Sequence, residues 1–176
     1  IWVSDNGSED GSQTMGRGLY PSVRLLENGE SLGFGSAVNR VLEKAEGHYF
    51  LFLNNDLELA PDCVVQLVDL LESDPHIGAA IPKILYHPDK QKPSLNNSAV
   101  INSFGVLINY TGIACPNLVD QQDRDGLTLT ETACGGIFMF RREVYEQVGG
   151  FDEDLFLYHE DHDLSWRIRL GGWKLM

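Results

Sequence analysis

Cysteine, basic residues and long apolar runs are all scarce in this chain of 176 residues. The three cysteines, Cys63, Cys115 and Cys134, form no CxxC pair, so neither a disulfide framework nor a zinc ribbon is indicated. The longest purely apolar run, Tyr49 to Leu53, is far shorter than the roughly 20 residues that cross a membrane. We therefore expect a reducing, cytoplasmic location, with any membrane association peripheral and made through regions outside this sequence.

Acidic residues dominate the charge. There are 26 of them against 13 basic residues, which gives a formal net charge of −13. An acidic surface repels polyanions, so we expect no nucleic-acid partner. A bound cation is the more plausible partner. The 43% of hydrophobic residues is enough for one domain over residues 1–176. The chain opens on Ile1 and a strand-like run, and we expect the full protein to extend at both ends.

Strand and helix signals alternate along the chain, the pattern of a parallel sheet covered by helices. Strands are predicted at residues 1–3, 23–26, 48–53, 77–81 and 134–140, and helices at residues 34–45, 61–72, 142–148 and 160–170. The expected fold class is α/β, with a Rossmann-like, mostly parallel sheet flanked by helices. The segment 82–130 is poorly patterned, with brief β-like runs such as Val106 to Tyr110.

The first of three acidic sites is DNGSEDGS, Asp5 to Ser12, directly after the opening strand. Ligands of open α/β sheets bind beyond the carboxyl ends of the strands, so we expect the three sites to face one pocket. A carboxylate here can accept hydrogen bonds from a ribose or a base edge. A plain polar turn also explains the pattern, whereas an EF-hand loop fails because its twelfth position is Arg17 rather than Glu.

The second site, Asn54-Asn55-Asp56-Leu57-Glu58, follows the aromatic strand that ends at Leu53. A carboxylate just past a strand can hold Mg²⁺ or Mn²⁺ while a substrate diphosphate supplies further oxygens. The alternative is a capping and turn cluster that leads into Pro61.

The third site, Tyr158 to Leu164, opens the last predicted helix. Glu160 and Asp163 share a helical face and Asp161 points differently, so one carboxylate can act as a general base while another binds an acceptor. An acidic first turn that favours the helix dipole explains the composition without catalysis. Zinc bound by His159 and His162 is a further alternative, although no distant Cys or His cluster completes such a set.

Five motifs occur in a fixed order: DNGSEDGS, NGESLGFGSAVN, YFLFLNNDLEL, CGGIFMFRREVYEQVGGFDE and FLYHEDHDLSWRIRLGGW. In this order the chain resembles family 2 glycosyltransferases with the GT-A fold, particularly the rhamnosyltransferase-like branch, over nearly its whole length. The resemblance implies inverting transfer of a sugar from a nucleotide-diphosphate donor to a hydroxyl of a glycan or lipid-linked glycan. It also implies assistance by Mg²⁺ or Mn²⁺ and a place in cell-surface polysaccharide synthesis.

The resemblance implies roles for single residues as well. It makes Asp161 the catalytic base and Asp56 the metal ligand, with Asn54 in place of the first acid of the family's DXD motif. The residues implied in acceptor binding are Glu160, Gly135 and Gly136. The residues implied in nucleotide-sugar binding are Asp5, Asn28, Gly33, Asn39, Asn54 and Asn55.

Two features of the family are absent between Ile1 and Met176: a strand with its loop upstream of the DNGS turn, and a His beyond the last helix. A second hypothesis is therefore that the protein is a catalytically silent module that binds a nucleotide sugar or a carbohydrate. A calcium-stabilised extracellular domain is a third hypothesis, suggested by the acidity and by sequons at Asn6, Asn96 and Asn109. The free cysteines and the failed calcium loop count against it.

Overall fold

The computed structural model describes residues 1–87, 99–108, 114–123 and 136–176. The helices of these residues are α1 (Ser12–Leu19), α2 (Phe34–Leu42), α3 (Cys63–Ser73), α4 (Arg142–Val148) and α5 (Glu160–Leu170). The strands are β1 (Trp2–Asp5), β2 (Arg24–Glu27), β3 (Tyr49–Leu53), β4 (Ile77–Ala80), β5 (Ile84–Leu85), β6 (Ile101–Ser103), β7 (Val106–Ile108), β8 (Ala114–Pro116), β9 (Ile137–Arg141) and β10 (Lys174–Leu175).

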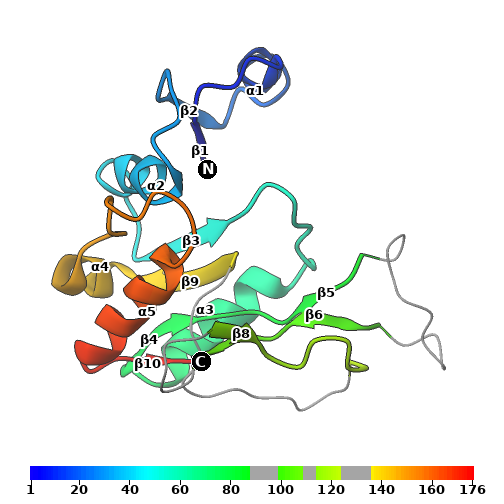
Figure 1. Cartoon of the computed structure of the whole chain (residues 1–176), viewed down its shortest axis with the longest axis vertical. Coiled ribbons are helices and arrows are strands. Elements are labelled where there is room, and N and C mark those ends of the chain that lie inside the picture. Colours follow the sequence, from blue (N-terminus) through cyan, green and yellow to red (C-terminus); the bar gives the residue numbers. More distant parts are fainter. Residues whose placement is uncertain (88–98, 109–113, 124–135) are drawn as a thin grey trace.

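The central sheet has the strand order β10-β4-β9-β3, and β1 and β2 form a separate parallel pair (Figure 1). Strand β9 runs antiparallel to both of its neighbours, and β10 runs parallel to β4. The predicted α/β class is confirmed, but the sheet is mixed rather than mostly parallel. The reason is connectivity: a helical crossover makes β3 and β4 point the same way, whereas the described part of the segment between β4 and β9 holds no helix.

Strand β9 forms the centre of the core because both of its faces are covered. Phe138 and Phe140 pack on one face in a cluster that includes Leu164 of α5. Met139 points to the other face and packs in a cluster that includes Leu71 of α3. The run IFMF is therefore continuously apolar, as expected of a strand buried on both faces.

Several element ends differ from the sequence-based expectation. Helix α2 ends at Leu42, before the predicted Ala45, and α3 begins at Cys63 because Pro61 and Asp62 form a turn. Helix α1 was not predicted at all. It spans only eight residues and contains Gly16 and Gly18, and glycine is unfavourable in a helix interior.

No helix among the described residues is long and apolar enough to cross a membrane. The cytoplasmic location stays a prediction.

Candidate active site

The start of helix α2 contacts the first acidic segment and residues that lie just before the other two in the chain. The side-chain amide of Asn6, next to Asp5, donates to the carbonyl of Gly33 at 2.9 Å. The backbone N–H of Phe34 donates to the carbonyl of Phe156 at 3.1 Å, and Phe156 lies four residues before α5. The Phe34 ring lies 5.0 Å from the Phe52 ring near the end of β3. Figure 1 shows the segment between α4 and α5, in orange, running beside α2.

Gly33 allows this close approach because it has no side chain. Its φ is +81°, a left-handed conformation that L side chains rarely adopt. A Cβ atom at this position would lie 2.5 Å from the carbonyl oxygen of Phe156 and 2.9 Å from its ring. Gly33 therefore joins the segment predicted to line the donor site to the segment that leads into α5.

Asp5 is buried at the end of β1 and organises the loop that follows. Its Oδ2 atom accepts hydrogen bonds from the backbone N–H of Gly7 and of Ser8, each at 3.1 Å, and from Nε2 of Gln13 at 2.7 Å. Hydrogen bonding from Ser8, joined by the bonds from Gln13 and Gly7, holds the pKa of Asp5 below its ordinary value despite its burial. The nucleoside contact implied for Asp5 stays a prediction.

Asn28 connects the end of β1 to helix α2. Its Nδ2 atom donates to Ser4 Oγ and to Asn6 Oδ1, each at 3.0 Å, and its Oδ1 atom accepts from Arg40 at 3.2 Å. The Ser4 hydroxyl in turn donates to the carbonyl of Ala37 at 2.8 Å. Asn28 thus fixes the shape of the predicted donor loop, and its contact with a donor stays a prediction.

Asn39 fastens α2 to the segment between α4 and α5. Its Nδ2 atom donates to the carbonyl of Phe151 at 2.9 Å and to Glu153 at 3.0 Å, and its Oδ1 atom accepts the N–H of Phe151 at 2.8 Å. Both ends of the amide are thereby used within the protein. Asn39 thus braces α2 against this segment, and its implied contact with a donor stays a prediction.

The residues after β3 alternate between partly buried and exposed positions. The backbone N–H of Asn54 donates to the carbonyl of Gly136 at 3.1 Å, and a Cβ atom on Gly136 would lie 2.8 Å from Asn54 Nδ2. Asn55 and Asp56 follow in an exposed turn. Asn54, implied in donor binding, thus contacts Gly136, which is implied in acceptor binding. Gly135 lies outside the described residues.

Within the described ranges, no group of three or more His, Cys, Asp or Glu side chains could hold a metal ion. Protein sites for Mg²⁺ commonly use one or two carboxylates and take their other oxygens from substrate phosphates and water. The exposed carboxylate of Asp56 suits that mode, because it leaves room for a diphosphate. The metal role implied for Asp56 stays a prediction.

The two acids that begin α5 have contrasting environments. Glu160 is 7% exposed, and its Oε2 atom has no hydrogen-bond partner in the described part of the chain. Burial, and after it the neighbouring charge of Asp161, raises the pKa of Glu160. Asp161 is partly exposed, and its Oδ1 atom accepts the N–H of His162 at 2.8 Å. Asp161 is thus the more accessible of the two carboxylates.

The two histidines near this helix start contact each other. The Nδ1 atoms of His159 and His162 lie 3.1 Å apart, a hydrogen-bond distance between rings. Tyr158 and His159 both have positive φ, 69° and 72°. Non-glycine residues in this conformation are uncommon and concentrate where the surrounding structure holds them in place.

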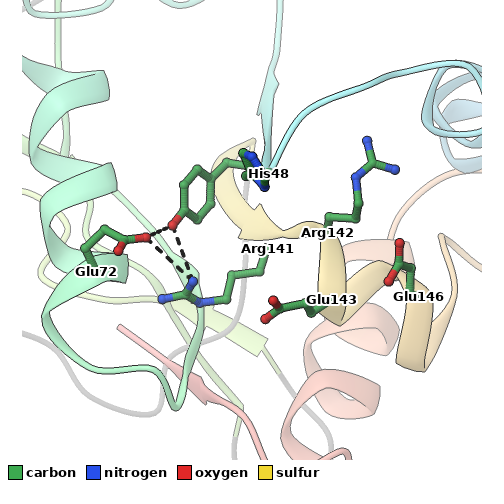
Figure 2. A pocket seen from close by; sticks show the side chains of 7 residues that line it. His48, Glu72, Arg141, Arg142, Glu143 and Glu146 are labelled. Atoms are coloured by element: carbon green, nitrogen blue, oxygen red, sulfur yellow. Dashed lines mark hydrogen bonds and ion pairs between the residues drawn. The ribbon is translucent and has the colours of Figure 1, made fainter.

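A hollow of about 480 Å³ lies at the other end of β3, away from these residues (Figure 2). Its lining residues are His48, Tyr49, Glu72, Arg141, Arg142, Glu143 and Glu146. Arg141 donates to the carbonyl of Ile77 at 2.9 Å, and Arg142 donates to the carbonyl of Ala45 at 2.9 Å. Because both guanidinium groups bind backbone carbonyls, we interpret this hollow as structural.

Sequence reasoning assigned no role of their own to three residues that shape the site: Asn6, Gln13 and Phe156. Asn6 and Phe156 lie inside quoted motifs, whereas no signal distinguishes Gln13 from other polar residues. Phe156 belongs to the run Phe156-Leu157-Tyr158, which is apolar within an acidic segment, and that contrast was a usable signal.

Comparison with known families gives two matches. The sequence profile described as glycosyl transferase family 2 matches residues 1–149. A second profile, described as the N-terminal domain of galactosyltransferase, matches residues 128–175.

Curated relatives include an N-acetylglucosaminyl-diphospho-decaprenol L-rhamnosyltransferase of Mycobacterium tuberculosis. The two sequences are 32% identical over an alignment of 193 residues. The alignment covers 98% of this chain and 62% of the relative. The rhamnosyltransferase WbbL of Escherichia coli is 30% identical over 84% of this chain and 58% of its own length. The chain thus spans about three fifths of the length of these relatives.

Solved structures with the same fold include glycosyltransferases. A mannosyltransferase of Pyrobaculum calidifontis, in complex with GDP-Man and Mn²⁺, gives a TM-score of 0.64 at 21% identity, over 100% of this chain and 44% of that one. The structure of GalNAc-T7 with UDP, GalNAc and Mn²⁺ gives a TM-score of 0.70 at 18% identity, over 99% of this chain and 34% of that one. The predicted GT-A fold is confirmed.

Proposed function

The chain belongs to glycosyl transferase family 2, and from that premise we propose that it transfers a sugar, with inversion, from a nucleotide-diphosphate donor to an acceptor hydroxyl. Rhamnose is the sugar we favour, and a lipid-linked glycan of cell-surface polysaccharide synthesis is the acceptor, because two relatives are rhamnosyltransferases and one is named for a decaprenol-linked substrate. The observation that supports the proposal is the contact of the start of α2 with Asn6, Phe52 and Phe156, which lie in or just before the three acidic segments. The Asp161 carboxylate is partly exposed.

Asp161 acts as the general base. An attacking hydroxyl must lose its proton as the new bond forms, and inversion by a single displacement needs one carboxylate for this step. Asp161 is the partly exposed acid at the start of α5, while Glu160 beside it is buried. General-base assistance of this kind contributes about 10² to 10⁴ in rate.

The donor lies against the loops that follow β1, β2 and β3. Asp5 and Asn28 shape the first two of these loops through the hydrogen bonds described above, and Asn55 and Asp56 follow the third. Asp56 would hold Mg²⁺ or Mn²⁺, which when bound neutralises the charge that grows on the leaving diphosphate.

The test compares Asp161→Asn with a matched control, Asp163→Asn, two residues further along α5. Asp163 pairs with Arg167 at 2.7 Å and serves no substrate in this scheme. With dTDP-, UDP- and GDP-sugars and Mn²⁺, we expect Asp161→Asn to lose transfer while nucleotide binding by calorimetry persists, and Asp163→Asn to keep both. Full transfer by Asp161→Asn would refute the assignment of the base.

A catalytically silent module is the second candidate, favoured by one observation. Asn54 replaces an acid and its side chain lies against Gly136, so the segment offers fewer charged ligands than an acidic motif would. Nucleotide binding by the wild-type protein, without transfer or nucleotide release across the donor panel, would favour this candidate.

A further inference from the structure

Three consecutive apolar side chains are exposed just before α5. Phe156 is 57% exposed, Leu157 55% and Tyr158 74%. We propose that the rings of Phe156 and Tyr158 form a stacking surface for a pyranose ring of the acceptor. This inference rests on the proposed function and names the part of the acceptor that these side chains would bind.

The surroundings of the segment position the Phe156 ring, and the backbone of Tyr158 has a defined conformation. The Phe156 carbonyl accepts the N–H of Phe34, and the Phe156 side chain lies against Gly33, where it leaves no space for a Cβ atom. Tyr158 has a left-handed backbone with φ of 69°. L residues rarely adopt that conformation. The backbone therefore has a defined shape that keeps aromatic surface in contact with water.

The position of the rings matches the place of an acceptor. Phe156 contacts Gly33, whose carbonyl is bound by Asn6, so its ring adjoins the predicted donor loop. Tyr158 stands three residues before Asp161 in the chain. A sugar on these rings would therefore lie between the donor loop and the group that takes the proton.

The chemistry of the surface favours a sugar over a lipid. A pyranose has an apolar C–H face that can pack on an aromatic ring, and hydroxyl groups around its edge that donate to carboxylates. Carboxylates flank the apolar run on both sides: Asp152, Glu153 and Asp154 precede it, and Asp161 follows it. The same charges would repel the anionic headgroups of a membrane surface.

The test measures binding of free monosaccharides to the 176-residue chain by saturation-transfer NMR, with rhamnose, N-acetylglucosamine and glucose as probes. Tyr158→Asn removes the ring, and Asn tolerates the left-handed backbone, so the fold is kept. Tyr158→Phe keeps the ring. We expect Tyr158→Asn to weaken sugar binding about tenfold and Tyr158→Phe to change it less than about twofold.

The matched control is Trp166→Ala, because Trp166 is another exposed aromatic residue, on α5 itself, and is 53% exposed. We expect this variant to bind sugars as the wild-type protein does. A second variant, Phe156→Ser, removes the other ring and is expected to act in the same direction as Tyr158→Asn.

Titration of the same samples with UDP, dTDP and GDP in the presence of Mn²⁺ separates the stacking surface from the proposed function. Ring-dependent sugar binding without any nucleotide binding would overturn the proposed function and support the stacking surface. Nucleotide binding and transfer with no ring-dependent sugar binding would overturn the stacking surface alone. Tyr158-dependent sedimentation with phosphatidylglycerol–phosphatidylethanolamine vesicles, in place of sugar binding, would overturn it in favour of a membrane contact.

Discussion

Replacement of Glu160 by Gln is expected to stabilise the fold at neutral pH. The side chain is 7% exposed, and its Oε2 atom has no partner among the described residues. Leaving a buried polar group unsatisfied costs about 1–3 kcal/mol, and more when the group is charged. Gln keeps the shape and removes the charge, but its amide also lacks a partner. The expected net gain in the free energy of unfolding is therefore about 1–2 kcal/mol at about pH 7.5.

The effect has a defined sign with pH. Burial raises the pKa of Glu160 above its ordinary value of 4.5, so the folded state keeps a proton that the unfolded state has released. The stability of the wild-type protein then falls as the pH rises from about 4.5 through the folded-state pKa. The glutamine side chain of the variant does not titrate, so the difference between the two proteins should appear over this interval and vanish below it.

Urea unfolding of both proteins between about pH 4 and pH 8 measures this difference. Glu146→Gln is the control, because Glu146 is an exposed glutamate of α4 and its replacement should shift no midpoint. Glu160→Met, which removes the polar group altogether, should show the same direction as Gln. An equal difference at the acidic and neutral ends of this range, or a loss of stability at neutral pH in both variants, would refute the account of Glu160 as a buried, unsatisfied acid.

Three further predictions concern the residues around α2 and β3. Asn39→Ala should lower the free energy of unfolding by about 2–3 kcal/mol in urea, since the backbone of Phe151 loses two partners; an unchanged midpoint would contradict the brace. Gly33→Ala should cost about 2–4 kcal/mol, from its positive φ and its contact with Phe156, whereas Gly29→Ala, with positive φ but open space, should cost less. Asp56→Asn should remove most of the Mn²⁺-dependent part of UDP binding in calorimetry; undiminished Mn²⁺ dependence would exclude Asp56 as the ligand.

The core elements could be predicted because their sequences carry apolar patterns that their burial then explains. The runs that became β3 and β9, and the helices α4 and α5, were placed to within a few residues. The direction of β9 could not be predicted, because apolar content shows that a strand is buried and not which way it runs. Helix α1 was not predicted because it is short and contains two glycines, Gly16 and Gly18.

The contacts that shape the site could not be read from the sequence. The order of motifs and the strand-end positions predict that Asp5, Asp56 and Asp161 belong to one region, and that convergence stays a prediction. The bond between Asn39 and Phe151 joins residues 112 positions apart, and only the fold brings them together. The burial of Glu160 was equally hidden, because an acidic first turn accounts for its presence without any contact.

The place of β9 in the sheet has a consequence for how this protein is made. Residues 49–53 of β3 pair with residues 137–141 of β9. Strand β4 pairs with β9 and β10. Both β9 and β10 come after β3 and β4 in the chain. During synthesis, β3 and β4 must therefore leave the ribosome long before their partners exist. Open strand edges of this kind invite pairing with other chains. The sheet is completed only after β9 and β10 have been synthesised. We therefore expect the incomplete chain to be most prone to aggregation while translation is slow.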